Sequence, residues 1–186
     1  ANWQSLKQVS TPQWLQEGKF GIYTHWGPYA VHAYGSNTTW YSFSLYQDPE
    51  GEAREHFEKT FGELSKDYGY KDLIPLFTAD KFNADEWAEL SAKSGAKFAG
   101  PVAEHHDGFA MWDTKYSEWN AVKMGPKRDV VGELEKAIKK RGMKFVTAFH
   151  HAANWFFFPV HDKQYDTGDP KNSGLYGQYH MPGEMR

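Results

Sequence analysis

The chain has 186 residues, which is enough for one sizeable domain with its own core. Its 21 basic and 24 acidic residues are interspersed and give a net charge of −3, so no basic stripe favours a nucleic-acid partner. Cysteine is absent, which excludes disulfides and thiolate metal sites, and no run reaches the ~18 to 20 apolar residues of a membrane span. The first ten residues are polar and lack the apolar centre of an export signal.

Three short apolar runs predict β-strands, at residues 19–25, 97–105 and 144–151. Each run begins with lysine and phenylalanine, continues with apolar residues for about five positions, and ends in histidine. Near-continuous apolar runs are typical of strands that are buried on both faces, as in parallel sheets. The runs therefore predict neighbouring strands of one parallel sheet.

A helical pattern precedes the second run and spans residues 83–95. Asn83 is suited to cap its first turn and Gly95 to end it. The spacing of Trp87 and Leu90 predicts that these two side chains face inward. The stretch therefore predicts an amphipathic helix directly before a strand.

A second helix is predicted at residues 129–142, between the second and third runs, because an aspartate caps it and a glycine ends it. Strict alternation of helix and strand is typical of βαβ units with a parallel sheet. Residues 48–62 indicate a short helix, and the rest of 32–80 is expected to be a long loop insertion. Beyond residue 151 the sequence is rich in Gly, Pro, Asp and Tyr and predicts no fourth strand.

Histidines gather at the predicted carboxyl ends of the three strands. They are His25, His105, His106, His150 and His151. In parallel α/β folds this edge of the sheet carries functional sites. Any one of these histidines alone is equally well explained as a buried, hydrogen-bonded support for a loop, whereas the set of five favours a site.

A metal centre is the first alternative, because Glu104 and Asp107 stand beside these histidines. Neighbouring residues of a regular strand point to opposite faces, so the adjacent pair His105 and His106 is not expected to reach one ion. The spacing His-x-His, which would put two ligands on one face, is absent. The pattern therefore favours a site without a metal.

Aromatic residues make up 17% of the chain, and many of them follow the strand ends. Those in question are Trp26, Trp40, Tyr41, Trp112, Tyr116, Trp119 and Trp155. About half are expected to be core, and the remainder would form an aromatic wall beside imidazole donors and acceptors. Such a wall suits a polyhydroxylated ring with one apolar face, which is a sugar. Asp107 and Gly108 are read as a tight turn.

Several motifs carry a family resemblance. They are KFGIYTHWGPYAVHAYG from residue 19, HHDGFAMWDTKYSEWN from residue 105 and GPKRDVVGEL from residue 125. The chain resembles, from about residue 13 to residue 155, the catalytic domain of glycoside hydrolase family 29, the retaining α-L-fucosidases. The second and third strings are long and specific, so the resemblance implies this family.

The resemblance implies substrate contacts at matching positions. His25, His105 and His106 match histidines that hold the hydroxyls of fucose, and Trp40 matches a residue that packs near the sugar. His150 falls near a position where many members carry tyrosine. Thr39 stands where many members carry a glutamate that contacts the sugar, which predicts a changed affinity or subsite preference. The family's nucleophilic aspartate and its acid/base are not matched in this chain, and no metal or other cofactor is expected.

The implied fold is α/β, a (β/α)8 TIM-like barrel that is usually followed by a β-sandwich domain. A closed barrel needs at least about 200 residues, and only three strand–helix units are predicted here. We therefore expect residues 1–186 to be the N-terminal portion of one catalytic barrel domain, inactive alone, with the rest of the barrel and any β-sandwich outside this chain. Partners are expected to be a fucosylated oligosaccharide or glycoconjugate, and an oligomer or complementing chain.

The predicted function of the complete protein is that of a retaining exo-α-L-fucosidase, which hydrolyses terminal α-L-fucose from glycans. This chain would supply the fucose-binding part of the site. Two alternatives stay open, a non-catalytic carbohydrate-binding protein and a metal-dependent barrel hydrolase. By family resemblance the location is expected to be secreted or periplasmic.

Overall fold

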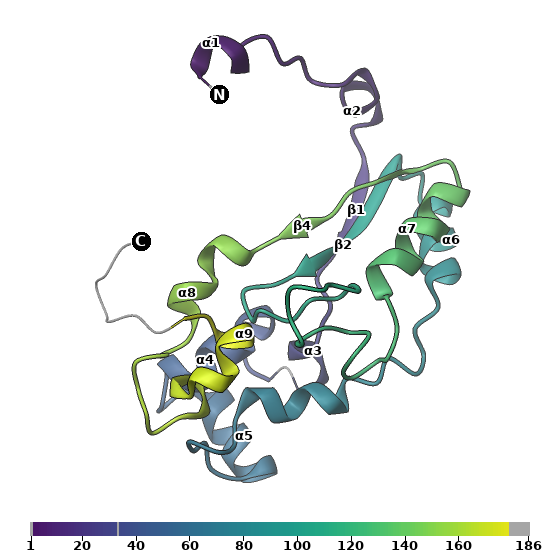
Figure 1. The fold of residues 1–186 in the computed structure, drawn as a ribbon. Helices are drawn as coiled ribbons and strands as arrows, with labels where there is room; N and C mark the ends of the chain where they lie inside the picture. The colour runs from purple at the N-terminus through teal and green to yellow at the C-terminus, as the bar shows by residue number, and fades with distance from the viewer. Residues whose placement is uncertain (1, 33, 179–186) are drawn as a thin grey trace.

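A parallel sheet forms the centre of the computed structural model, which describes residues 2–32 and 34–178 apart from the side chains of residues 153 and 155. Its strands are β1 (Gly21–Thr24), β2 (Phe98–Glu104), β3 (Lys144–Phe145) and β4 (Ala148–Phe149). Strand β2 is central, because β1 pairs with one side of it and β3 and β4 pair with the other, all in parallel (Figure 1). The three predicted strands and the parallel α/β class are confirmed.

The third predicted strand is split into β3 and β4 by a break at residues 146–147. A Cβ atom on Gly100 of β2 would lie 1.5 Å from the carbonyl oxygen of Val146, so only glycine leaves room for this backbone approach. The Thr147 hydroxyl donates to the carbonyl oxygen of Pro101 at 2.8 Å, and pairing then resumes with a register shift. The break redirects the chain just before His150.

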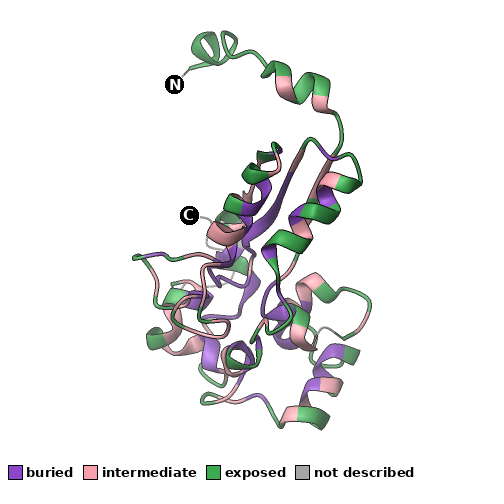
Figure 2. Ribbon diagram, turned by 90° about the vertical axis from the view of Figure 1, so that its right-hand side faces the viewer, coloured by how far each residue is buried: buried purple, intermediate pink, exposed green. Residues whose placement is uncertain are grey.

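The two predicted helices flanking β2 are confirmed as α6 (Ala84–Lys93) and α7 (Val130–Lys140). The Asn83 side chain accepts from two backbone amides of α6, and the Asp129 side chain accepts from Gly132 in α7. The helices pack against each other, and their outer faces are exposed while β2 is buried (Figure 2).

The predicted inward position of Leu90 is wrong, since its side chain is 70% exposed. The buried face of α6 consists of small residues, namely Ala84, Ala88 and Ser91. Small side chains let the helix lie close to its neighbours, so the face that enters the core is not the one with the largest apolar residues. Trp87 is half-buried and packs against the Trp26 ring.

The segment from residue 41 to residue 76 was predicted to be a long loop with one short helix, but most of it is helical. The short helix is present as α5 (Glu52–Phe61), but α4 (Tyr41–Gln47) and the 3-10 helix η2 (Tyr70–Leu76) flank it. These three elements supply much of the hydrophobic core, including Tyr41, Leu45, Tyr46, Phe57, Tyr70, Leu73 and Ile74. Helix α4 has no clear polar face in the sequence, because Ser42 lies among its buried residues and Gln47 is its only exposed residue.

Short helices make up both ends of the described chain. Near the N-terminus lie α1 (Trp3–Leu6) and α2 (Gln13–Gly18), which extend away from the rest of the fold, and then α3 (Tyr29–His32) and η1 (Thr38–Trp40) (Figure 1). After β4 follow η3 (His151–Ala153), α8 (Asn154–Phe157), η4 (Asp166–Gly168), η5 (Pro170–Asn172) and α9 (Ser173–Tyr176). As predicted, the described residues beyond 151 contain no strand.

A buried carboxylate ties this last segment to the core. The hydroxyls of Tyr46 and Tyr176 donate to the two oxygens of Asp166 at 2.7 and 2.5 Å. The tyrosine oxygens in turn accept from the backbone amides of Tyr70 and Lys71, each at 2.8 Å. Asp166 is fully buried, so this network joins α4, η2 and α9 through one side chain. In the part of the chain described here, no helix has the length and apolar character to cross a membrane.

Candidate functional site

Four of the predicted site histidines meet at the carboxyl edge of the sheet. His25 follows β1, His105 and His106 follow β2, and His150 follows β4. The strands are parallel and adjacent, so their carboxyl ends deliver these side chains to the same place. We call His25, His105, His106 and His150 the histidine cluster.

The rings of the cluster are in mutual contact. The His105 ring lies at the centre, with centroid distances of 4.6 Å to His150, 4.9 Å to His106 and 5.3 Å to His25. The His106 and His150 rings are 4.7 Å apart. His105 is only 3% exposed whereas His25 is exposed, so the cluster runs from a buried floor to an open rim.

A chain of hydrogen bonds orients two of these rings. His106 Nδ1 lies 3.1 Å from the carbonyl oxygen of His150, and because a carbonyl only accepts, Nδ1 carries the proton. His106 Nε2 is then an acceptor, and His150 Nδ1 lies 3.3 Å from it. The Tyr23 hydroxyl completes the chain at 3.2 Å from His150 Nε2. Sequence reasoning missed Tyr23, whose ring lies 4.9 Å from that of His25, two residues later in the chain.

Three histidines of the cluster, His25, His105 and His106, have lowered pKa values that favour their neutral forms. Burial lowers the pKa of His105 to about 3, with further lowering by the neighbouring His150, His106 and His25. Burial, followed by the proximity of His150, also lowers the pKa of His25 and that of His106. A neutral imidazole offers one donor and one acceptor, which matches the dual character of a sugar hydroxyl.

The sequence argument that separated His105 from His106 was wrong in its premise. Strand β2 ends at Glu104, so both histidines lie beyond the strand, where the alternation of faces no longer applies. His105, His106 and His150 each present one nitrogen, and these three nitrogens lie within 4.8 Å of one another. The described residues thus include a triad with the composition of a metal site.

Trp40 supplies an apolar wall beside the cluster. Its ring lies 5.4 Å from the His106 ring and 5.3 Å from both Phe43 and Phe157. The Phe157 ring also lies 5.3 Å from His106, nearly parallel to it. Thr39, which precedes Trp40 in η1, is half-buried. Trp40 is therefore placed with the histidines, as the sequence predicts.

The remaining predicted aromatic residues do not all join this wall. Trp26 packs in the core against Phe77, Phe82 and Trp87, and Tyr41 is fully buried. Tyr116 is 87% exposed, Trp119 is half-buried, and the Trp155 side chain lies outside the described residues. Trp112 contacts Phe149 in a separate cavity. Within the described part of this set, Trp40 alone has a ring contact with the cluster.

The turn after His106 is held from below by Asp107. As predicted, the turn is tight, since the Gly108 amide donates to the His105 carbonyl at 3.1 Å and Gly108 has a φ of +78°. Asp107 is 1% exposed, and it accepts from the Tyr70 hydroxyl at 2.6 Å and from the Phe109 amide at 3.3 Å. Burial raises its pKa to about 7, with the Tyr70 hydrogen bond as the main opposing effect.

Asn154 fixes the other side of this turn. Its side-chain amide donates to the carbonyl oxygens of His106, at 2.9 Å, and Leu175, at 3.2 Å. The partners are 48 and 21 residues away in sequence, so no local motif signals this contact. The backbone that carries His105 and His106 is therefore fixed by side chains from η2 and α8.

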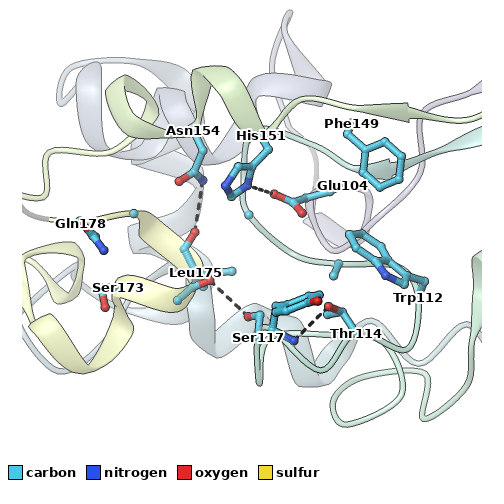
Figure 3. A pocket seen from close by; sticks show the side chains of 15 residues that line it. Glu104, Trp112, Thr114, Ser117, Phe149, His151, Asn154, Ser173, Leu175 and Gln178 are labelled. Atoms are coloured by element: carbon cyan, nitrogen blue, oxygen red, sulfur yellow. Dashed lines mark hydrogen bonds and ion pairs between the residues drawn. The ribbon is translucent and has the colours of Figure 1, made fainter. Parts of the chain in front are cut away.

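A cavity of about 650 Å³ lies behind the strand ends (Figure 3). Its lining includes Glu104 and His151, which are joined by a hydrogen bond of 2.6 Å, and the Trp112 and Phe149 rings. Asn154 also lines it, whereas the cluster histidines are not among its described lining residues. Of the five predicted strand-end histidines, His151 is thus the one that points away from the cluster, into this cavity.

Comparisons with known proteins identify the family of this chain. The family model of α-L-fucosidase matches residues 1–185. Human plasma α-L-fucosidase is 37% identical over 155 residues, which cover 83% of this chain and 32% of that protein. An α-L-fucosidase of Branchiostoma floridae is 38% identical over 187 residues, covering 96% and 40% respectively.

Solved structures show the same fold. The Thermotoga maritima α-fucosidase in complex with fucose matches with a TM-score of 0.74 and 40% identity, over 80% of this chain and 36% of that one. The chain spans roughly a third of the length of the curated relatives it matches. Since the family model covers nearly every residue and the parallel α/β fold agrees with solved fucosidases, this chain belongs to the α-L-fucosidase family.

Proposed function

We propose that this chain supplies the fucose-binding part of a retaining exo-α-L-fucosidase, which releases terminal α-L-fucose from glycans. The observation that carries the proposal is the convergence of four imidazoles and Trp40 at the carboxyl edge of a parallel sheet, in a member of this family. The relative from Thermotoga maritima has been crystallised with fucose. In this proposal residues 1–186 form the first part of a (β/α)8 barrel.

The cluster suits the hydroxyls of the sugar. Lowered pKa values favour the neutral forms of His25, His105 and His106. A neutral imidazole has one donor and one acceptor, and His106, whose Nδ1 proton is donated to the His150 carbonyl oxygen, offers the acceptor Nε2 to a hydroxyl. The Nδ1 atom of the deeply buried His105 has no hydrogen-bond partner in the described structure. An unpaired buried polar atom is costly, and a sugar hydroxyl would satisfy it. We therefore place the ring with its hydroxyls toward His105.

The wall beside His106 suits the methyl group that distinguishes fucose from a hexose with a hydroxyl at that position. Trp40 contacts His106 and is only half-buried, and the fully buried Phe157 supports the Trp40 ring from the core side. Burial of one methyl group against such a surface contributes about 0.8 kcal/mol. A hydroxyl at that position would lose hydrogen bonds to water without gaining a partner from these rings.

The two catalytic carboxyl groups are proposed to come from other parts of the complete enzyme. Near the cluster the described chain offers Glu104 and Asp107. Glu104 is hydrogen-bonded to His151 in the cavity of Figure 3, and Asp107 is buried beneath the turn. A retaining mechanism needs a nucleophile and an acid/base about 5 to 5.5 Å apart across the glycosidic bond. This chain would bind and orient the ring between them.

Calorimetric titration with L-fucose tests the proposal. We expect saturable binding that His25→Ala and His106→Ala each weaken at least tenfold, while His161→Ala, outside the cluster, does not. L-galactose, which carries a hydroxymethyl group where fucose has its methyl group, should bind more weakly. Equal affinity of the parent and both cluster variants would remove these residues from the sugar site.

Turnover by the complete enzyme separates the alternatives. Release of L-fucose from an aryl α-L-fucoside with retention of configuration supports the proposal, whereas binding of fucose without turnover supports a carbohydrate-binding protein. Loss of turnover on chelation would support a metal-dependent hydrolase, for which the three-histidine triad is the relevant observation. Partners are proposed to be fucosylated glycans, with a complementing chain or oligomer. The proposed location is secreted or periplasmic, and the human relative is named a plasma enzyme.

A further inference from the structure

We infer that the histidine cluster is also a binding site for a divalent transition-metal ion of the Zn²⁺ type, held by His106, His150 and His105, and that the ion and the sugar exclude each other. Three nitrogens within 4.8 Å of one another, one from each of these residues, motivate the inference. It relies on the proposed function only for the competition with fucose.

The separation of the first two nitrogens matches tetrahedral zinc. His106 Nε2 and His150 Nδ1 lie 3.3 Å apart. Two nitrogens bound at about 2.05 Å to a tetrahedral ion are separated by about 3.3 Å, because the angle at the metal is about 109°. The ring torsion of histidine is soft enough for each ring to turn its lone pair toward the ion.

The tautomer of His106 is already that of a ligand. Its Nδ1 proton is committed to the His150 carbonyl oxygen, which leaves the lone pair on Nε2 facing His150. In metal-bound histidines the N–H of the second ring nitrogen usually donates a hydrogen bond to a carbonyl or carboxylate in this way, which fixes the ring and raises its basicity. His106 therefore needs no proton rearrangement to bind an ion.

His150 reaches the ligand state by moving one proton along its hydrogen-bond chain. Without metal, its Nδ1 donates to His106 and its Nε2 accepts from the Tyr23 hydroxyl. With metal, Nδ1 binds the ion and Nε2 carries the proton and donates to the Tyr23 oxygen. The Tyr23 hydroxyl hydrogen then turns to solvent, since Tyr23 is 46% exposed. Both states satisfy the same partners, so the change leaves no polar group unpaired.

His105 provides the third ligand from the floor of the cluster. It is 3% exposed and its Nδ1 has no hydrogen-bond partner in the described structure, so it lacks the satisfied contacts that a purely structural histidine would have. Three imidazoles leave one tetrahedral position open for water, as in other three-histidine zinc sites. An all-nitrogen set excludes Mg²⁺ and Ca²⁺, which require oxygen ligands.

Mutual exclusion follows from the shared nitrogens. His106 Nε2 and the His105 ring cannot bind an ion and also hydrogen-bond to sugar hydroxyls, because each lone pair serves one partner. Zinc is therefore expected to act on this protein as a competitive inhibitor of sugar binding, and fucose to protect the site from the metal. This differs from a metal-dependent hydrolase, in which the ion would promote turnover.

The test is calorimetric titration of the EDTA-treated, dialysed chain with Zn²⁺, and with Mg²⁺ as a negative control. We expect one zinc per chain, and a loss of affinity of at least tenfold in His106→Ala and in His150→Ala, since even removal of outer partners of metal ligands costs 10- to 100-fold. His151→Ala and His161→Ala are matched controls that retain the parent affinity. Circular dichroism confirms that each variant is folded.

Two results would overturn the inference. One is zinc binding that both cluster variants leave unchanged, which would place the ion elsewhere, and the other is no zinc binding by the folded parent. Repeating the titration with saturating L-fucose should raise the apparent zinc dissociation constant at least tenfold. Simultaneous binding of both ligands would refute mutual exclusion while leaving the fucose proposal intact, and failure of fucose to bind would refute that proposal while leaving the zinc titration valid.

Discussion

Removal of the Asp166 side chain should destabilise the protein substantially. Tyr46 is 4% exposed and Tyr176 is fully buried. In Asp166→Ala the hydroxyls of both tyrosines lose their acceptor. A buried donor without a partner costs about 1 to 3 kcal/mol. The tyrosine oxygens keep their bonds from the Tyr70 and Lys71 amides, which favours the lower part of that range. We expect the free energy of unfolding to fall by about 2 to 4 kcal/mol in total.

Urea and thermal unfolding followed by circular dichroism measure this loss. For a chain of this size 1 kcal/mol corresponds to a change in Tm of about 2 to 4 °C, so Tm should fall by about 4 to 16 °C. Asp67→Ala is a matched control, because the Asp67 side chain is 84% exposed, and it should change stability by less than about 0.5 kcal/mol. An Asp166→Ala variant as stable as this control would refute the account of the network.

The same carboxyl group makes stability depend on pH in a defined direction. Burial raises the pKa of Asp166, and the hydrogen bonds from Tyr176 and Tyr46 oppose this only in part. A carboxyl that holds its proton more tightly in the folded state contributes stability below its unfolded pKa of about 3.9, and that contribution is lost as pH rises through the folded pKa. Asp166→Asn cannot titrate. The stability of the parent relative to this variant should therefore decrease from pH 3 to pH 8, and a constant difference would contradict the assigned shift.

Two further substitutions test the supports of the site. Gly100→Ala should lower the free energy of unfolding by more than 3 kcal/mol or prevent folding, because its Cβ would lie 1.5 Å from the Val146 carbonyl oxygen. Gly95→Ala, in open space with a φ of +89°, should lower the free energy of unfolding by about 1 kcal/mol in the same assay. Tyr70→Phe removes the hydroxyl that donates to Asp107, so it should lower the free energy of unfolding by about 1 to 3 kcal/mol and weaken L-fucose binding several-fold. Unchanged affinity for L-fucose would show that the turn does not depend on this hydrogen bond.

The parallel sheet could be predicted because its strands are continuous apolar runs with a clear end, and the caps of α6 and α7 are local signals. Helix α4 could not be predicted in this way, since a polar residue, Ser42, lies on its buried face and only Gln47 is exposed, which hides the helical pattern of polar and apolar residues. The inward position predicted for Leu90 was wrong because its hydrophobicity does not show that α6 buries its small residues instead.

Some features of the candidate site could also be predicted from the sequence, and others could not. His25, His105, His106 and His150 could be predicted to meet, because the order of parallel strands fixes which chain ends are neighbours. Their supports were not predicted, since Tyr70 reaches Asp107 over 37 residues and Asn154 reaches His106 over 48. Side-chain contacts at such separations depend on tertiary packing rather than on any local pattern.

The lack of a side chain at Gly100 affects the position of the histidine cluster, although Gly100 lies on β2 whereas His150 follows β4. The break between β3 and β4 is made possible by a residue of β2, Gly100, which is not a member of the histidine cluster. Redesign of sugar preference by exchanging only rim residues would leave that break untouched. A change as small as one methyl group, 46 positions upstream of the break, would misdirect His150 and leave the other residues of the histidine cluster unchanged in sequence.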